Sequence, residues 1–433
     1  MTKRISRREA ITAGFAGAAA GALGACGNGA GGTETPVAAP TGSAPQTGSG
    51  VRAVVVGAGA FGGWTALWLR RAGAEVTLVD AWGAGNARAS SGGESRLIRA
   101  TYGTRRIYSE MVARGLQIWK EHEARWDDRL LFSIGMLRMS SGVHEYAKSA
   151  LPILRELGFR VEEFDGDELA RRFPQINPEG LSYAVLERDA GYLLARRGCE
   201  RVLEEFQAEG GTFVRAEAAP GAMDAGRMRE IRLSDGSTVE ADLFVFACGP
   251  WLAHLFPGFD PPLVQSTRQE VFYFGPPAGR ADVTEEELPT WIEGPFYGIP
   301  ATRFRGFKIA DDRRGAAFDP TGGDRTPSAK GAREAREYME HRFPGMRGAP
   351  LIEARVCQYE QSADGNLIVD THPEADNVWI AGGGSGHGYK LGAALGEMLA
   401  GQALGEREKE PFFGLARFAG ADAAGPSATY RRT

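Results

Sequence analysis

The sequence predicts an α/β protein with a doubly wound dinucleotide-binding domain, built from several segments of the chain, and a second, mostly antiparallel α+β domain. Three observations predict this fold class. A glycine-rich turn at 57–62 joins an apolar strand to a helix. A turn of small residues at 247–250 follows another apolar strand. A further glycine-rich loop at 382–388 again joins a strand to a helix.

The first element is a short run of apolar, mostly β-branched residues at 51–56, which is typical of a buried parallel strand. It ends in Gly57, Gly59 and Gly62, and the residues at 63–72 then follow helical spacing. Gly57 permits the tight turn, Gly59 lets backbone amides approach a pyrophosphate, and Gly62 lets helix and strand pack closely. The helix N-terminus would direct its partial positive charge at the phosphates.

A second apolar strand at 75–79 ends in Asp80, where an acid can accept hydrogen bonds from ribose hydroxyls. A lone GxGxxG is weak in a chain with 60 glycines, but the complete unit of about thirty residues is specific. The late loop at 382–388 then distinguishes between cofactors. A simple nicotinamide enzyme does not need it, whereas a flavin lying across the sheet does, so the unit is predicted to be an FAD-binding, Rossmann-like domain.

Composition narrows the function classes. The chain has 433 residues, of which 43% are hydrophobic, and a formal charge of -5, so its length suggests two domains or one large one. This balance gives no electrostatic reason to expect a nucleic-acid partner. The four cysteines are scattered and the six histidines form no close Cys/His cluster, so no metal site is predicted.

The first fifty residues are predicted to be an export signal followed by a linker. Arg7 and Arg8 precede a short Gly/Ala-rich run and resemble a twin-arginine export signal, a route for folded cargo. The residues ending at Cys26 resemble a lipobox, in which Cys26 is lipidated and anchors the protein to a membrane. Residues 27–50 read as a disordered linker. The protein is therefore expected to be periplasmic or membrane-anchored; the alternative is a basic N-terminus with a chance arginine pair.

Further motifs stand in a defined order along the chain, at 79–82, 90–102, 189–192, 357–359 with 370–373, and 384–390. Together they resemble the monomeric sarcosine oxidase and N-methyl amino acid oxidase family, within the larger group of D-amino-acid-oxidase-like FAD-dependent oxidoreductases. The resemblance covers residues 51–410. The motifs and the resemblance together predict these cofactor-binding residues: Gly57, Gly59, Ala60, Phe61, Gly62, Asp80, Ala81, Ser91, Arg96, Cys248, Gly249, Trp251, Cys357, Gly384, Gly386, His387, Gly388 and Lys390.

The resemblance also implies individual roles. Cys357 matches the cysteine that attaches the flavin as an 8α-S-cysteinyl thioether; the alternative is a buried, inert cysteine. Arg96 matches an arginine over the flavin ring, and Arg99 matches the arginine that holds the substrate carboxylate, for which its planar fork is suited. Tyr359 and Lys390 match residues around that carboxylate.

Lys308 matches the lysine that activates dioxygen above the flavin, where a fixed positive charge stabilises developing superoxide. Two positions depart from the family pattern. Asp312 replaces an active-site histidine, and its carboxylate would repel a substrate carboxylate and attract an additional cationic group. Gly92 replaces a histidine near the attachment site. Sarcosine itself is therefore not favoured as the substrate.

The FAD-binding domain is predicted to be discontinuous, and strands of the second domain are expected at 130–139, 270–274 and 305–310. Trp291, Phe296 and Tyr297 are candidates for an apolar substrate pocket. The predicted segments are 51–135, 185–250 and 355–410 for the FAD-binding domain, 136–184 and 251–354 for the substrate domain, 1–26 for the signal and 416–433 for a flexible tail.

Three functions are compatible with these features. The leading one is an oxidase that converts a secondary amine or N-methyl amino acid to an imine and passes the electrons to dioxygen, giving hydrogen peroxide. The second is an amine dehydrogenase of the same fold that passes electrons to a quinone or another carrier. The third is a non-catalytic flavin-binding protein. A small-molecule amine is the expected partner, and a monomer is favoured.

Overall fold

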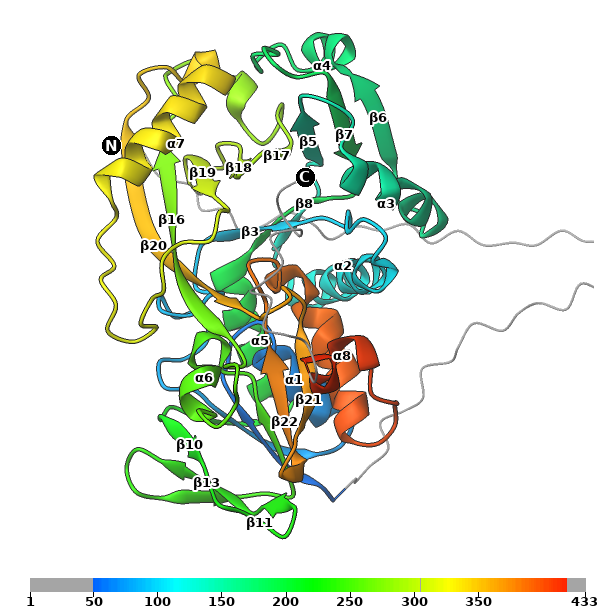
Figure 1. Cartoon of the computed structure of the whole chain (residues 1–433), viewed down its shortest axis with the longest axis vertical. Coiled ribbons are helices and arrows are strands. Elements are labelled where there is room, and N and C mark those ends of the chain that lie inside the picture. The colour runs from blue at the N-terminus through cyan, green and yellow to red at the C-terminus, as the bar shows by residue number, and fades with distance from the viewer. Residues whose placement is uncertain (1–49, 304, 419–433) are drawn as a thin grey trace, which may run out of the picture. The chain divides into compact units, whose positions relative to one another are not determined.

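A computed structural model describes residues 50–303 and 305–418. The predicted signal, Cys26, the linker up to residue 49 and the tail beyond 418 lie outside the described residues. A six-stranded sheet forms the lower half of the described part (Figure 1). Its strand order is β21 (Ile368–His372), β22 (Ala375–Gly382), β15 (Leu243–Phe246), β1 (Arg52–Val56), β2 (Glu75–Val79) and β9 (Thr212–Val214).

The neighbours in this sheet pair in parallel, except that β21 pairs antiparallel with β22. The strands are mostly buried apolar runs, as expected for a sheet covered on both faces. Helix α1 (Gly62–Arg71) packs against α5 (Ala195–Ala208) and α8 (Gly392–Ala403), and α8 also packs against α2 (Arg106–Trp126). The predicted doubly wound domain is confirmed.

A second, eight-stranded sheet lies above the first in Figure 1, and α7 (Ala329–Arg342) packs against β16 and β19. All of its pairings within the described residues are antiparallel apart from that of β17 with β5. Its order is β20 (Leu351–Gln361), β16 (Gln265–Phe274), β19 (Phe307–Asp311), β18 (Phe296–Ile299), β17 (Thr290–Glu293), β5 (Met136–Ser140), β7 (Tyr183–Glu187) and β6 (Val161–Asp165).

The strands expected at 270–274 and 305–310 are present as parts of β16 and β19. The single strand expected at 130–139 is instead divided into a short strand at 131–132 and β5, which belong to different sheets. Strands β7 and β20 run across the predicted segment boundaries at 185 and 355. The remaining strands form small sheets: β3 (Ser95–Ile98), β8 (Gly191–Leu194) and β4 (Leu131–Phe132); β10 (Ala218–Pro220), β13 (Glu230–Leu233) and β14 (Thr238–Glu240); β11 (Met223–Asp224) and β12 (Arg227–Met228).

The remaining helices are short or cover the upper sheet. None of the helices in the described part is long and apolar enough to cross a membrane. They are α3 (Glu145–Glu156), α4 (Gly166–Arg172) and α6 (Leu252–Leu255), with the 3-10 turns η1 (Gly249–Trp251), η2 (Ala281–Val283), η3 (Pro344–Met346), η4 (Tyr389–Leu391), η5 (Pro411–Phe413) and η6 (Leu415–Phe418).

Of the three candidates for an apolar pocket, Trp291 belongs to the core and Phe296 packs against it. The Trp291 ring is fully buried, with ring centroids 4.7 Å from Phe307 and 4.6 Å from Phe343. Phe296 stacks on Tyr338 at 4.3 Å. The prediction was wrong for Trp291 because aromatic identity does not reveal which face of a strand meets the core, and for the partly exposed Phe296 it stays a prediction.

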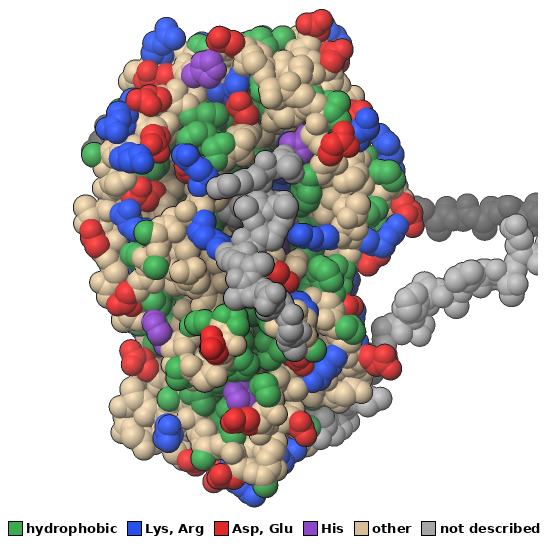
Figure 2. Space-filling model, in the orientation of Figure 1, with side chains coloured by type: hydrophobic (Ala, Val, Ile, Leu, Met, Phe, Trp, Pro, Cys, Tyr) green, Lys and Arg blue, Asp and Glu red, His purple; other side chains and the backbone are tan. Residues whose placement is uncertain are grey.

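Acidic and basic side chains are interspersed over the face in view in Figure 2. Among the described residues, Arg160 and Asp189 form an ion pair. No single sign of charge dominates that face. The three cysteines among the described residues, Cys199, Cys248 and Cys357, are free thiols.

Candidate active site

The glycine turn after β1 leaves no room for a side chain at Gly57 or at Gly62. Gly57 has a φ of +104°, and a Cβ there would lie 2.5 Å from the Ala247 carbonyl oxygen. A Cβ on Gly62, the first residue of α1, would lie 1.9 Å from the Gly57 carbonyl oxygen. These contacts explain the glycines physically: the turn, the strand end after β15 and the start of α1 approach one another backbone to backbone.

Asp80 follows β2 and organises the turn. Its Oδ2 accepts a hydrogen bond from the Ala58 amide at 2.8 Å. Its Oδ1 accepts from the amides of Trp82 at 2.9 Å and Gly83 at 2.7 Å. Asp80 also lines the pocket described next. The contact with a ribose stays a prediction, while the contacts with the two loops fix the shape of the pocket.

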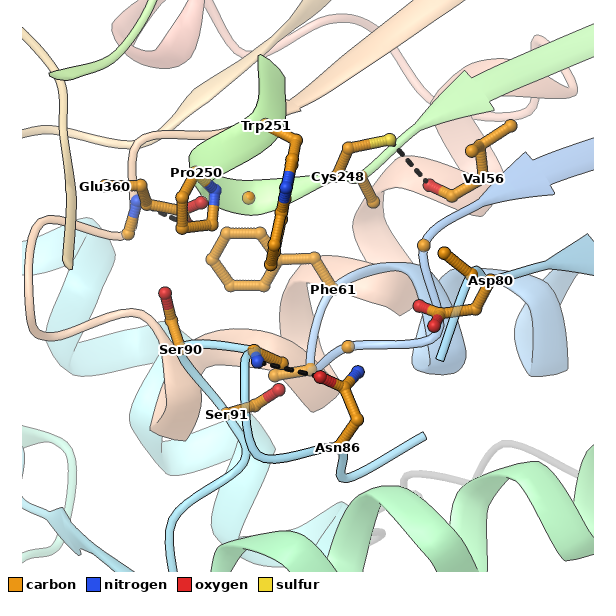
Figure 3. A pocket seen from close by; sticks show the side chains of 18 of the residues that line it. Val56, Phe61, Asp80, Asn86, Ser90, Ser91, Cys248, Pro250, Trp251 and Glu360 are labelled. Carbon is orange, nitrogen blue, oxygen red and sulfur yellow. Dashed lines mark hydrogen bonds between the residues drawn. The ribbon is translucent and has the colours of Figure 1, made fainter. Parts of the chain in front are cut away.

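A pocket of about 430 Å³ lies at the carboxyl ends of the parallel strands, where doubly wound sheets bind dinucleotides (Figure 3). In this view Asp80 and Glu360 lie on opposite sides, with the Trp251 and Phe61 rings between them. The predicted residues that line it are Gly57, Gly59, Ala60, Phe61, Asp80, Ala81, Ser91, Arg96, Cys248, Gly249, Trp251, Gly384, Gly386 and Gly388, together with the predicted catalytic residue Tyr359.

Four predicted cofactor residues do not line this pocket: Gly62, Cys357, His387 and Lys390. Gly62 instead allows the start of α1 to approach the Gly57 carbonyl oxygen. His387 is buried behind the late glycine loop, where its ring nitrogens lie 3.2 Å from the Tyr102 hydroxyl and 3.0 Å from the Gly365 carbonyl oxygen.

Sequence reasoning missed several lining residues. The Trp82 ring lies 5.0 Å from that of Trp251, whose Nε1 donates to Thr321 Oγ1 at 2.8 Å. Thr321 belongs to a long connection between β19 and α7 and carries no motif that would have identified it. Trp82 stood in a recognised motif and could have been chosen. The other lining residues that were not predicted include Asn86, Ser90, Glu217, His254, Glu360 and Tyr389.

Three predicted residues meet beside the pocket. Arg96, on β3, donates from Nη1 to the Ser95 carbonyl oxygen at 2.8 Å, and the Lys308 ammonium donates to the same oxygen at 2.8 Å. Arg96 Nη2 lies 3.6 Å from Cys357 Sγ. Strands β3, β19 and β20 therefore bring two cations and the candidate attachment cysteine together.

Lys308 is almost fully buried, at 1% exposure. Burial, followed by the charge of Arg96, lowers the pKa of Lys308 well below its ordinary value. The ammonium lies 5.7 Å from the centre of the Tyr297 ring. Its flanking residues Phe307 and Ile309 pack into the core of the upper sheet, as strand alternation requires.

Asp312 lies on the same side as the tyrosines. The Tyr359 hydroxyl donates to Asp312 Oδ1 at 2.9 Å, and it lies 3.5 Å from the Tyr297 hydroxyl. Burial and then the charge of Asp312 raise the pKa of Tyr297 to about 12. The departure from the family pattern at Asp312 thus places a carboxylate in contact with Tyr359, a predicted substrate-binding residue.

Arg99 and Lys390 share one neighbour. The Arg99 guanidinium lies 4.8 Å from the centre of the Tyr102 ring and donates to the Thr101 carbonyl oxygen. The Lys390 ammonium lies 5.6 Å from the same ring and donates to the His387 carbonyl oxygen at 2.9 Å. Both basic side chains are buried next to Tyr102, and their predicted contact with a substrate carboxylate stays a prediction.

The glycine cradle fits the FAD that the sequence predicts, because a Cβ at Gly57 or Gly62 would close it. A dinucleotide cradle that ends against buried cations places the chain among the flavin-dependent oxidoreductases. Residues 52–402 match the family described as FAD dependent oxidoreductase (DAO), and the chain belongs to this family. Its cofactor is FAD.

Individual relatives are similar over most of their length. The monomeric sarcosine oxidase of Bacillus sp. (strain B-0618) is 29% identical over 364 residues, which cover 81% of this chain and 91% of that protein. The N-methyl-L-tryptophan oxidase of Yersinia pestis (strain Pestoides F) is 23% identical over 376 residues, covering 84% and 98%. The crystal structure of L-proline dehydrogenase from P. horikoshii shares the fold with a TM-score of 0.75, at 19% identity, covering 85% of this chain and 97% of that one.

Proposed function

We propose that this enzyme oxidises a secondary amine, such as an N-methyl amino acid, to an imine that water hydrolyses, and that dioxygen accepts the electrons as hydrogen peroxide. The bound FAD supplies the two-electron redox chemistry. The observation that carries the proposal is the buried Lys308 beside Arg96, at the end of the cofactor pocket. The similarity to a sarcosine oxidase and an N-methyl-L-tryptophan oxidase supports the substrate class.

The substrate is oriented by charge. Arg99 and Lys390 hold its carboxylate, since both are buried at Tyr102 and such cations bind carboxylates strongly when water is excluded. Asp312 attracts a second, cationic group of the substrate. The Tyr359 hydroxyl donates a hydrogen bond to the Asp312 carboxylate and so positions it. Amino acids with an additional amino group are therefore better substrates than sarcosine.

An amine dehydrogenase that passes electrons to a quinone or another carrier is the second candidate. The lowered pKa of Lys308 favours it, because any loss of positive charge from this side chain weakens the stabilisation of superoxide. Two assays separate the candidates. Peroxide is measured across N-methyl amino acids, cyclic imino acids and dibasic N-methyl amino acids, and bleaching of the flavin is measured without oxygen. Peroxide at the rate of bleaching supports the oxidase; bleaching without peroxide supports the dehydrogenase.

Covalent attachment of FAD through Cys357 is part of the proposal. Its sulfur lies 3.6 Å from Arg96, which itself lines the pocket. After acid precipitation the yellow colour should stay with the protein, and Cys357→Ser should release it. Colour that leaves wild-type protein with the supernatant would refute attachment.

Export is proposed from the sequence alone. Arg7 and Arg8 direct the folded, FAD-loaded chain across the membrane, and Cys26 anchors it by a lipid. Fractionation of cells that express wild type, Arg7→Lys/Arg8→Lys and Cys26→Ala tests both steps. The paired lysines should retain the protein in the cytoplasm, and Cys26→Ala should release it from membranes. A relative named monomeric supports a monomer, which size-exclusion chromatography tests.

A further inference from the structure

Glu360 is a buried acid that the chemistry above does not use. It lies near the end of β20, next to Tyr359, and is 7% exposed. Oε1 accepts a hydrogen bond from the Gly384 amide at 3.1 Å. Oε2 is buried and has no hydrogen-bond partner among residues 50–303 and 305–418. Within the same residues no basic side chain forms an ion pair with it, so half of this carboxyl group is unsatisfied.

The fold makes room for this carboxyl group with two glycines. A Cβ on Gly249, in the turn after β15, would lie 2.7 Å from Oε2, and a Cβ on Gly384, in the loop after β22, would lie 2.7 Å from Oε1. The backbone is held as well, because the Ser385 amide donates to the Glu360 carbonyl oxygen at 2.9 Å. Two separate strand ends therefore enclose the acid instead of letting it turn toward solvent.

Glu360, Gly249 and Gly384 all line the cofactor pocket. Buried polar atoms in proteins are nearly always bonded, so an unsatisfied oxygen at a ligand pocket points to a ligand donor. FAD carries such donors in both halves: hydroxyls on the ribityl chain and a ring N–H in the flavin half, and ribose hydroxyls in the adenosine half. Asp80 lies on the opposite side of the pocket in Figure 3, whereas Glu360 adjoins Tyr359 in sequence.

We propose that Glu360 contacts bound FAD, with Oε2 accepting a hydrogen bond from a hydroxyl or N–H group of the flavin half. The carboxyl group thereby positions the flavin relative to the sheet, while Asp80 and the glycine turn serve the adenosine and phosphate half. The inference rests on FAD as the cofactor and is independent of the amine and of the electron acceptor proposed above.

The test compares affinities for FAD and for ADP, which lacks the flavin half. Full-length Cys357→Ser protein is the background, so that covalent attachment cannot hide dissociation. Glu360→Ala should weaken FAD binding by about 10- to 100-fold, the effect of removing a hydrogen bond to a charged group, and leave ADP binding unchanged. Gln361→Ala is the matched control, since it alters a buried neighbour that does not line this pocket.

Unchanged FAD affinity in Glu360→Ala would overturn the contact. Equal weakening of FAD and ADP would overturn its assignment to the flavin half. An infrared difference spectrum between FAD-loaded and FAD-free protein gives a second readout that does not depend on the alanine variant folding. The background protein should show a carboxyl band that shifts on loading and is missing in Glu360→Gln; a spectrum that Glu360→Gln leaves unaltered contradicts the proposal.

Discussion

The cofactor pocket and the group of buried charges beside it are formed by different parts of the chain. The pocket is made largely by backbone at the ends of β1, β2, β15 and β22, four strands whose parallel register is continuous. The buried charges come from three different parts of the fold: Arg96 on β3 of a small three-stranded sheet, Lys308 on β19 of the eight-stranded sheet and Lys390 after β22. One region depends on the absence of side chains and the other on particular side chains.

The difference lies in how polar groups are satisfied. In the pocket, backbone groups and Asp80 bond to each other across two loops. Beside it, one carbonyl oxygen, that of Ser95, accepts hydrogen bonds from both Arg96 and Lys308. Arg96 also donates to the Ser90 carbonyl oxygen at 2.6 Å, so backbone carbonyl groups hold these two side chains. We therefore expect shape changes to damage the first region and charge changes to damage the second.

The largest effect should come from adding one methyl group to the glycine turn that borders the pocket. Gly62→Ala places a Cβ 1.9 Å from the Gly57 carbonyl oxygen, whereas Gly63→Ala places one 3.5 Å from the Val202 side chain. We expect Gly62→Ala to weaken FAD binding by about 4 kcal/mol, or about 10³-fold, because backbone must move. Flavin absorbance per protein measures the loss. If Gly63→Ala loses as much flavin, the clash at Gly62 is not the cause.

The next effect separates charge from shape. Lys308→Met keeps the length of the side chain and removes its charge, so reoxidation of reduced enzyme by dioxygen should slow by about 10²- to 10³-fold. Anaerobic reduction by substrate should change little. Stopped-flow absorbance measures both steps, with the exposed Lys330→Met as control. In wild type the reoxidation rate should fall as pH rises through the lowered pKa of Lys308, since the cation is lost there. Equal reoxidation rates in Lys308→Met and wild type would show that Lys308 does not activate dioxygen.

A smaller effect is expected at the carboxylate clamp. Arg99→Ala should weaken the binding of carboxylate-containing substrates and inhibitors by about 10²-fold, since it removes a charge-assisted bidentate contact. Amines without a carboxylate should bind as before. Inhibition constants of wild type and Arg99→Ala for a carboxylic acid inhibitor and its matched amide measure this effect. If both inhibitors lose the same affinity, Arg99 lies outside the substrate site.

The cofactor pocket and the group of buried charges also differ in how far the sequence predicts their residues. Gly57, Gly59 and Gly62 were predictable because their spacing, between an apolar strand and a helix, encodes a local backbone requirement. Arg96, Lys308 and Cys357 are far apart in sequence, and only the resemblance to a family grouped them. The structure brings these three together, and separately brings Arg99 and Lys390 to Tyr102.

Other contributors had no local signal. Thr321 reaches the pocket from the long connection after β19, and its bond to Trp251 depends on where that connection folds back. Glu360 follows Tyr359 near the end of β20 and lines the same pocket, but only the tertiary structure shows that this end of the strand meets the cofactor pocket. Thr321 and Glu360 were missed because their positions at the pocket depend on tertiary packing. The glycines of the turn were found because a local sequence pattern encodes them.

The last expected effect concerns the stability of the FAD-free protein when the buried Glu360 ionises. Burial, partly opposed by the Gly384 amide, raises the pKa of Glu360 from its ordinary 4.5 to about 7. Between these values the folded protein keeps a proton that the unfolded chain has lost, so stability falls as pH rises from 4.5 to about 7 and then levels off. The difference of about 2.5 pKa units corresponds to about 3 kcal/mol.

Glu360→Gln removes this ionisation and should therefore stabilise FAD-free Cys357→Ser protein at about pH 8 relative to about pH 5, by up to about 3 kcal/mol. Urea unfolding at the two pH values measures the change, and Glu217→Gln, which removes an exposed acid from the same pocket, is the control. A Glu360→Gln effect that is the same at both pH values would mean that this carboxyl group ionises without penalty. The pocket would then contain solvent around Glu360, and its shape alone would account for cofactor binding.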